Sequence, residues 1–189
     1  MPVTVLDPQT ALIVIDLQKG IMAYPTVHNV GGVLAKSLKL AGAFRARNLP
    51  VVLVNVAGMA PGRNEQPVRT ATLPPDWADL APELAGCASD HLVTKRTWGA
   101  FSNTDLADYL AQHGVTQVVI AGIATSIGVE STARQAHERG LNVTLAVDAM
   151  TDMNEDAHVN SVTRIFPRLG ETGTVEDILS CLDGEGPRK

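Results

Sequence analysis

Runs of apolar, β-branched residues recur along the whole chain. Five of them predict strands, at 11–16, 50–56, 91–94, 115–121 and 141–147. These runs are nearly unbroken rather than alternating with polar residues, which is typical of parallel strands covered on both faces. The pattern therefore predicts a mostly parallel sheet that is buried between layers.

Segments with helical character lie between these runs. One segment spans 30–48, where apolar side chains recur at roughly helical spacing at Val33, Leu34, Leu38, Ala41 and Phe44. Further helices are predicted at 105–113, 129–139, 154–165 and 175–182. Candidate helix starts are Asn103 or Thr104, and Thr174, and candidate ends are Gly114 and Gly140.

The alternation of strands and helices sets the expected fold class. It predicts an α/β protein with a doubly wound, Rossmann-like, mostly parallel sheet and helices on both faces. No internal repeat or interdomain linker interrupts it, so we expect one domain over 1–189. Residues 57–90 are rich in Pro and Gly and lack a sustained period. Loops of this length are usually functional or partnered, so this one is expected to cover the site or build a subunit interface.

Composition narrows the classes of partner. Hydrophobic residues make up 45% of the 189 residues, and the net charge is −5. Without a basic cluster, nucleic acids and anionic membranes are not expected as partners, and no apolar run approaches a membrane span. The start of the chain lacks the features of a signal peptide, and two cysteines make no disulfide framework. We therefore expect an intracellular, cytoplasmic protein.

Three features fall near the carboxyl ends of the predicted strands. Asp16 ends the first strand, and a strand-to-helix elbow at 122–132 follows the fourth. In the commonest strand order these two strands are neighbours and flank the point where ligands bind. Lys95 follows the third strand, which lies farther away in that order, so Lys95 must reach back on its loop.

Each feature alone has a simpler explanation. Asp16 would cap the next turn, Lys95 would be a solvated lysine, and the elbow would be a plain strand–helix turn. A dinucleotide site fits poorly, because the spacing of Gly122 and Gly128 does not match G-x-G-x-x-G.

Taken together, the three features resemble the isochorismatase-like hydrolase family, also called the cysteine hydrolase family. The matching stretches are Ile13-Val-Ile-Asp-Leu-Gln18, Lys95 to Phe101, Gly122-Ile-Ala-Thr-Ser-Ile-Gly-Val-Glu-Ser-Thr132, Val147-Asp-Ala-Met150 and His158. The resemblance covers residues from about 9 to 180.

The resemblance implies a catalytic site with one departure. The family's usual triad is Asp, Lys and Cys; Asp16 and Lys95 match the first two, and the Cys position falls on Gly128. A glycine cannot form an acyl-enzyme, which puts thiol chemistry in doubt. Isochorismatases within the family also have glycine there, and they cleave a vinyl ether to release pyruvate. The resemblance then implies that Asp16 is the general acid and that Lys95 holds a substrate carboxylate.

Further residues are expected to bind substrate by the same resemblance. They are Gln18, Trp98, Phe101, Ile123, Ala124, Thr125, Ser126 and Ile127. Trp98 is alternatively a subunit contact, and Phe101 is alternatively core. Ser126 is expected mainly to cap the helix that starts near Val129. Backbone N–H groups at 127–129 are expected to bind an oxyanion or carboxylate, and the resemblance implies a cis peptide bond after Ile123.

Neither a metal nor a cofactor is expected. Nicotinamidase-like relatives carry an Asp-x-His motif near the second strand, but residues 55–61 here contain no histidine. The five histidines are scattered without ligand spacing, and His158 is expected to be structural or at an interface. Cys87 and Cys181 both lie away from the elbow.

Two other functions stay open. One is a C–N hydrolase in which Asp16 orients water to attack an amide directly. The other is a protein without catalysis that binds a small ligand or serves as an assembly subunit. The presence of both Asp16 and Lys95 favours an active site. Members of the family are commonly oligomeric, so we expect a homo-oligomer, a dimer or larger.

Overall fold

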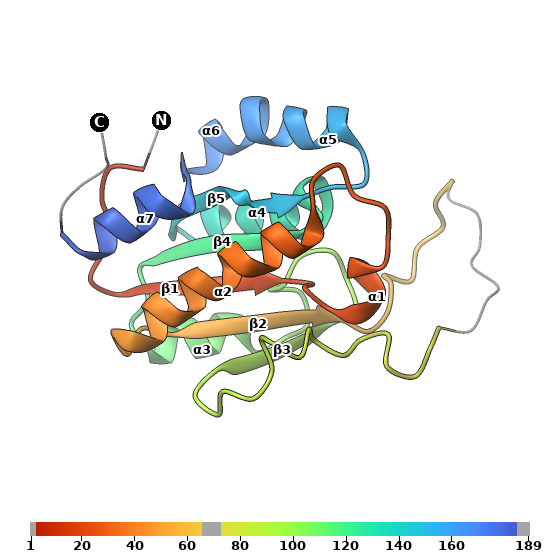
Figure 1. Ribbon diagram of the computed structural model, residues 1–189, viewed down its shortest axis with the longest axis horizontal. Coiled ribbons are helices and arrows are strands. Elements are labelled where there is room, and N and C mark those ends of the chain that lie inside the picture. Colours follow the sequence, from red (N-terminus) through yellow and green to blue (C-terminus); the bar gives the residue numbers. More distant parts are fainter. Residues whose placement is uncertain (1–2, 66–72, 185–189) are drawn as a thin grey trace.

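The computed structural model describes residues 3–65 and 73–184, and a six-stranded sheet forms their centre (Figure 1). The strands are β1 (Thr10–Ile15), β2 (Val51–Val56), β3 (His91–Lys95), β4 (Gln117–Ile123), β5 (Asn142–Thr151) and β6 (Glu171–Gly173). All paired strands run parallel, in the order β3-β2-β1-β4-β5-β6. The predicted α/β class with a parallel sheet is confirmed.

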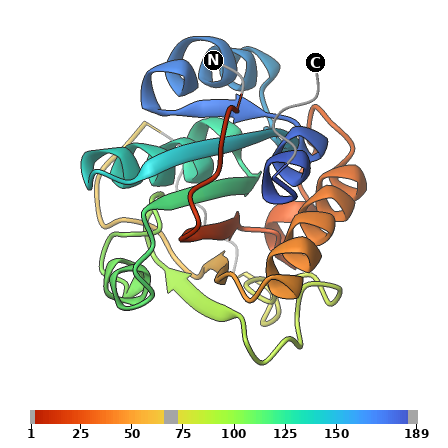
Figure 2. The same ribbon diagram turned by 90° about the vertical axis from the view of Figure 1, so that its left-hand side faces the viewer.

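Helices cover both faces of the sheet (Figure 2). On one face lie α2 (Val30–Ala46) and α7 (Val175–Leu182); on the other lie α3 (Leu106–Gln112), α4 (Glu130–Glu138) and α6 (Phe166–Leu169). Because side chains alternate along a strand, β1 supplies both cores: Leu12 and Val14 pack with the first group of helices, and Ile13 and Ile15 with the second. No helix in the described ranges is long and apolar enough to cross a membrane.

The element boundaries differ from the predicted ones in a few places. Strand β4 begins and ends two residues later than expected, so it includes Gly122 and Ile123. The segment predicted as one helix at 154–165 is α5 (Glu155–Asn160), a π-helical turn (Ser161–Ile165) and then α6. Helix α1 (Lys19–Met22) and strand β6 were not predicted, because three or four residues are too few to establish a period.

Two predicted helix ends and one predicted helix cap are confirmed. Helices α3 and α4 stop just before Gly114 and Gly140, as expected. Thr174 caps α7 as predicted: its side chain accepts from the N–H of Asp177, whose carboxylate accepts from the N–H of Thr174 in return. Helix α3 begins one residue later than expected, and the Thr104 hydroxyl accepts from the N–H of Leu106.

The strand order places the candidate site. From β1 the chain moves outward to β2 and β3, and then β4 returns to the other side of β1. The crevice between β1 and β4 is therefore the switch point at which doubly wound sheets bind ligands. Ile15 pairs with Gly122 in this register, so Asp16 and Ile123 both stand at the carboxyl edge of the sheet.

Candidate active site

Asp16 has an unusual backbone and a buried side chain. It directly follows β1, its φ of 50° lies in the left-handed region, and its N–H donates to the carbonyl of Val54 at 2.9 Å. A non-glycine residue in that region often marks a functional turn. The residue is only 5% exposed. Its two carboxyl oxygens differ: Oδ2 has a hydrogen-bond partner, and the buried Oδ1 has none among residues 3–65 and 73–184.

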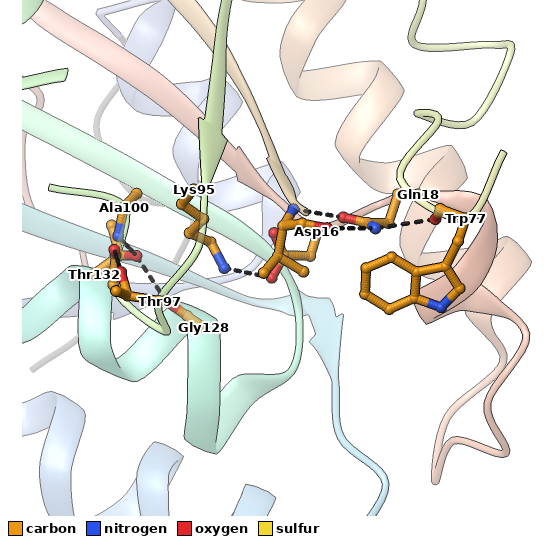
Figure 3. Close-up of polar contacts among 10 residues, drawn as sticks. Asp16, Gln18, Trp77, Lys95, Thr97, Ala100, Gly128 and Thr132 are labelled. Atoms are coloured by element: carbon orange, nitrogen blue, oxygen red, sulfur yellow. Dashed lines mark hydrogen bonds and ion pairs between the residues drawn. The ribbon is translucent and has the colours of Figure 1, made fainter. Parts of the chain in front are cut away.

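The partner of Asp16 is Lys95. The Lys95 ammonium donates to Asp16 Oδ2 at 2.7 Å, and the Lys95 side chain is 2% exposed (Figure 3). Lys95 was expected to reach back from a loop, and that expectation is wrong. It is the last residue of β3 and pairs with Val56, so its long side chain extends past the end of β2 to Asp16.

Burial and the lysine act in opposite directions on the Asp16 carboxyl. Removal from water disfavours the charged form and raises the pKa of Asp16, whereas the nearby Lys95 charge and its hydrogen bond lower it. Burial is the larger effect, so the pKa of Asp16 rises to about 6. The sequence left this balance open, and the geometry resolves it toward a carboxyl group that can hold a proton near neutral pH.

The elbow begins where β4 passes very close to β1. At Gly122, φ is 118°, and a Cβ atom there would lie 2.0 Å from the carbonyl oxygen of Ile15, so only glycine fits. The Ile123–Ala124 peptide bond is cis, as the family resemblance implied. A π-helical turn, Thr125–Val129, then leads into α4. The N–H groups of Ile127 and Val129 both donate to Ala124 at 3.1 Å, so they serve the turn itself rather than the ligand role expected of them.

Gly128 faces Asp16 across the switch point. A Cβ atom at this buried position would lie 3.2 Å from Asp16 Oδ2 and 2.9 Å from Cγ2 of Ile15. A side chain at position 128, where the family resemblance puts a cysteine, would therefore point toward the Asp16 carboxylate. The chain has no nucleophilic side chain at that position.

Gly128→Ala is expected to lower the free energy of unfolding by about 1–3 kcal/mol, because the new methyl group overpacks the contact with Ile15. Urea denaturation measures the change. Gly42→Ala is the matched control: that glycine lies in α2 with open space around it, so alanine should stabilise the protein by about 0.5–1 kcal/mol. Equal stabilisation by both substitutions would show that Gly128 is not confined.

Two hydroxyl groups in the elbow contact residues that follow β5 in the chain. The N–H and hydroxyl of Ser126 both donate to Asp152 Oδ2, at 2.7 and 2.8 Å. Ser126 was expected to cap a helix starting near Val129; instead, the helical turn begins earlier, at Thr125, and Ser126 lies inside it. The Thr125 hydroxyl lies 2.8 Å from Nδ1 of His158 in α5.

Asp152 itself was missed by the sequence reading. It is 2% exposed, and its other oxygen accepts from the N–H groups of Met153 and Asn154. The predicted strand ended at residue 147, whereas β5 runs to Thr151, so only the structure shows that Asp152 directly follows a strand as Asp16 does. The bonds from Ser126 show that Asp152 anchors the elbow.

The other predicted substrate-binding residues fall in different surroundings. Trp98 is 63% exposed. Phe101 is 5% exposed and packs in the core beneath α3 and α4, with the Arg139 guanidinium 4.7 Å from its ring centroid. Gln18 is fully buried, and its side chain contacts the main chain of Val56 and Trp77. Ile123 and Ala124 are buried at the start of the elbow, where β4 ends.

Thr132 joins the elbow to the loop that follows Lys95. Its hydroxyl donates to the carbonyl of Gly128 at 2.7 Å and accepts from the N–H of Ala100 at 3.1 Å (Figure 3). Thr132 is fully buried, so these bonds hold the two segments in a fixed relation.

Among residues 3–65 and 73–184, no three His, Cys, Asp or Glu side chains gather closely enough to hold an ion. Cys87 and Cys181 are both partly buried, and neither is in the elbow.

Comparisons with known proteins agree with this fold and with the family that the sequence resembles. A model of the isochorismatase domain matches residues 10–177. The isochorismatase family protein YwoC of Bacillus subtilis is 39% identical over 179 residues, which cover 90% of this chain and 93% of YwoC. YecD of Escherichia coli O157:H7, from the same family, is 41% identical over 180 residues, or 92% of this chain and 96% of YecD. Both relatives are described as uncharacterized.

A solved structure is similar over nearly the whole chain. It is an isochorismatase family protein from Burkholderia thailandensis, with a TM-score of 0.90 and 42% sequence identity. The match covers 95% of this chain and 98% of that one.

Proposed function

Since this chain belongs to the isochorismatase family of hydrolases, we propose that it cleaves a vinyl ether in a small molecule, with Asp16 as general acid and water as nucleophile. The best-fitting reaction is the conversion of isochorismate to dihydroxydihydrobenzoate and pyruvate. The observation that carries the proposal is that Asp16 and Gly128 face each other. A buried, protonatable carboxyl group faces a position that has no nucleophilic side chain.

The free oxygen of Asp16 is the one that would carry the proton. Oδ2 accepts from the Lys95 ammonium, so a proton on the carboxyl group goes to Oδ1, which has no partner in the part of the chain that the structure describes. An acid whose proton is not engaged elsewhere can donate it to substrate.

The chemistry needs no covalent intermediate. Asp16 protonates the terminal carbon of the enol ether, which leaves a cation stabilised by the ether oxygen. Water adds to that cation and returns a proton to Asp16, and the hemiketal collapses to a keto acid and an alcohol. While Asp16 is ionised, Lys95 stabilises its carboxylate at 2.7 Å. One water is consumed, and the acid is regenerated.

The direct test uses purified full-length protein and isochorismate, with pyruvate measured through lactate dehydrogenase. Steady release of pyruvate is the expected result. If none is released while small amides are hydrolysed, the C–N hydrolase alternative takes its place. If neither substrate reacts, the alternative without catalysis is favoured.

The pH profile distinguishes an acid from a base. Because Asp16 must be protonated to act as the acid, kcat/KM should be greatest below its pKa of about 6. Above that pH it should fall about tenfold per pH unit, as the protonated fraction falls. Rates between pH 5 and 8 measure this. A kcat/KM that instead rises through pH 6 would assign Asp16 the role of base, as direct attack of water on an amide requires.

A further inference from the structure

Two histidines that are far apart in the chain lie against each other beside the elbow. His28 belongs to the loop that leads into α2, and His158 lies in α5, which packs on the π-helical turn of the elbow. Their ring centroids are 4.7 Å apart, and the rings are inclined at 59°. His158 is half-buried and His28 is exposed. A positive charge on either ring therefore acts at short range on the other.

Each ring contacts the hydroxyl of a buried threonine. Nδ1 of His158 lies 2.8 Å from the hydroxyl of Thr125, which is the first residue of the π-helical turn. Nδ1 of His28 lies 3.3 Å from the hydroxyl of Thr151, which is the last residue of β5. Both threonines are fully buried, and Thr151 pairs in the sheet with Ile123, where the elbow begins. The histidine pair thus connects the outer loop and α5 to the start of the elbow.

The hydrogen bonds define the protonation state in which this contact is satisfied. Among residues 3–65 and 73–184, the Thr125 hydroxyl has one hydrogen-bond partner, Nδ1 of His158. A buried hydroxyl needs an acceptor for its hydrogen, so Thr125 donates and Nδ1 of His158 is unprotonated. Uptake of a proton would turn Nδ1 into a donor. The hydrogen of Thr125 would then lack an acceptor in the part of the chain that the structure describes, which is unfavourable for a buried group.

The charged groups that face His158 come from three elements, and they act in opposite directions on its pKa. Burial of the ring lowers the pKa most, and His28 in the outer loop lowers it further. The carboxylates of Asp152, after β5, and of Glu155, in α5, raise it by less. The pKa of His158 therefore lies below its ordinary value of 6.5, which favours the neutral ring that the Thr125 contact requires.

From these contacts we infer that His158 is a positioning residue that holds the elbow while its ring is neutral, and that His28 opposes its charged form. Uptake of a proton by His158 weakens the attachment of the π-helical turn to α5. The same turn carries Gly128, which faces Asp16, so protonation at His158 acts on the geometry of the candidate site. The inference concerns the elbow and holds whichever reaction the site performs.

Linkage gives the expected pH dependence of stability. Because the pKa of His158 is lower in the folded chain than its ordinary value of 6.5, the unfolded chain binds more protons in that interval. The contribution of His158 to stability is therefore present above pH 6.5 and is lost as pH falls through the pKa of the folded chain. The contribution of Asp16 is common to wild type and to variants at His158, so a comparison between them isolates the histidine.

Urea denaturation at pH 8 and pH 5 tests the inference with two variants. His158→Asn places an amide oxygen close to the position of Nδ1, so it keeps an acceptor for Thr125 but cannot take up a proton. It should match wild type in unfolding free energy at pH 8 and lose less stability than wild type between pH 8 and pH 5. His158→Phe removes the acceptor and should be less stable than His158→Asn at both pH values.

The matched control is His113→Asn. His113 is an exposed histidine that follows α3, and its Nδ1 lies 2.8 Å from the carbonyl of Tyr109 in that helix. The substitution should leave the difference in stability between the two pH values as it is in wild type.

NMR titration of the His158 ring gives a second readout, which tests the role of His28. His28→Asn keeps an oxygen near Thr151 and removes the neighbouring positive charge, so the pKa of His158 should rise toward 6.5. The amide signal of Thr125 should titrate with the same midpoint as the His158 ring in wild type and in His28→Asn.

The outcomes separate this inference from the proposed reaction. An unchanged His158 midpoint in folded His28→Asn, or a loss of stability in His158→Asn equal to that of wild type, would overturn it. If His158→Phe does not fold, the two asparagine variants decide. Neither measurement involves turnover, so the absence of pyruvate release from isochorismate would contradict the vinyl-ether proposal alone.

Discussion

Asp16→Asn is expected to lower kcat for vinyl-ether cleavage by a factor of about 100 to 10,000, the usual contribution of a general acid. The asparagine oxygen can still accept from Lys95, so the buried contact and the shape of the site should survive. What the variant loses is the transferable proton on Oδ1. KM should therefore change little, and steady-state kinetics at pH 6 would separate the two parameters.

The matched control is Asp183→Asn. Asp183 is an exposed carboxylate that follows α7 and pairs with Arg47, so its loss should leave kcat unchanged. A thermal melt of both variants shows that they are folded. Full activity in a folded Asp16→Asn variant would remove Asp16 from the mechanism.

Lys95→Met is expected to lower the free energy of unfolding by about 3–5 kcal/mol at pH 8, because it leaves a buried carboxylate without its counter-charge. Urea denaturation at pH 8 and pH 5 measures the effect. The matched control is Lys36→Met, which removes a partly exposed lysine paired with Asp148 and should cost about 1 kcal/mol or less.

The pH dependence of this loss has a definite sign. The pKa of Asp16 in the folded chain, about 6, lies above the ordinary value of 3.8, so the folded state binds more protons in that interval. Stability therefore falls as pH rises through it. Without Lys95 the folded pKa rises further and the interval extends upward, so the loss should be smaller at pH 5, where Asp16 takes up a proton. A loss that is equal at both pH values would show that the carboxylate is not the group left uncompensated.

Local chemistry was sufficient to predict most of the fold. All five predicted runs became strands. In β1, β2 and β4 the run is apolar because the strand is buried on both faces, whereas β3 is a mixed, partly exposed edge strand. Helix ends at Gly114 and Gly140, and the cap at Thr174, depend on one or two residues and were also predictable. The three-residue β6 was not, because it owes its pairing to β5 rather than to a pattern of its own.

The features of the candidate site fall into two groups: those that the local sequence predicted and those that tertiary contacts set. The sequence by itself determined a carboxylate after the first strand and a glycine elbow after the fourth, because each belongs to one continuous stretch of chain. Only the tertiary structure decided that Lys95 reaches Asp16 past the end of β2. It also decided that burial raises the pKa of Asp16 more than the Lys95 charge lowers it. It decided as well that Gly128 faces that carboxylate and that Gln18 donates to the main chain of Trp77. These relations join segments far apart in the chain, and desolvation and contact depend on all of their neighbours at once.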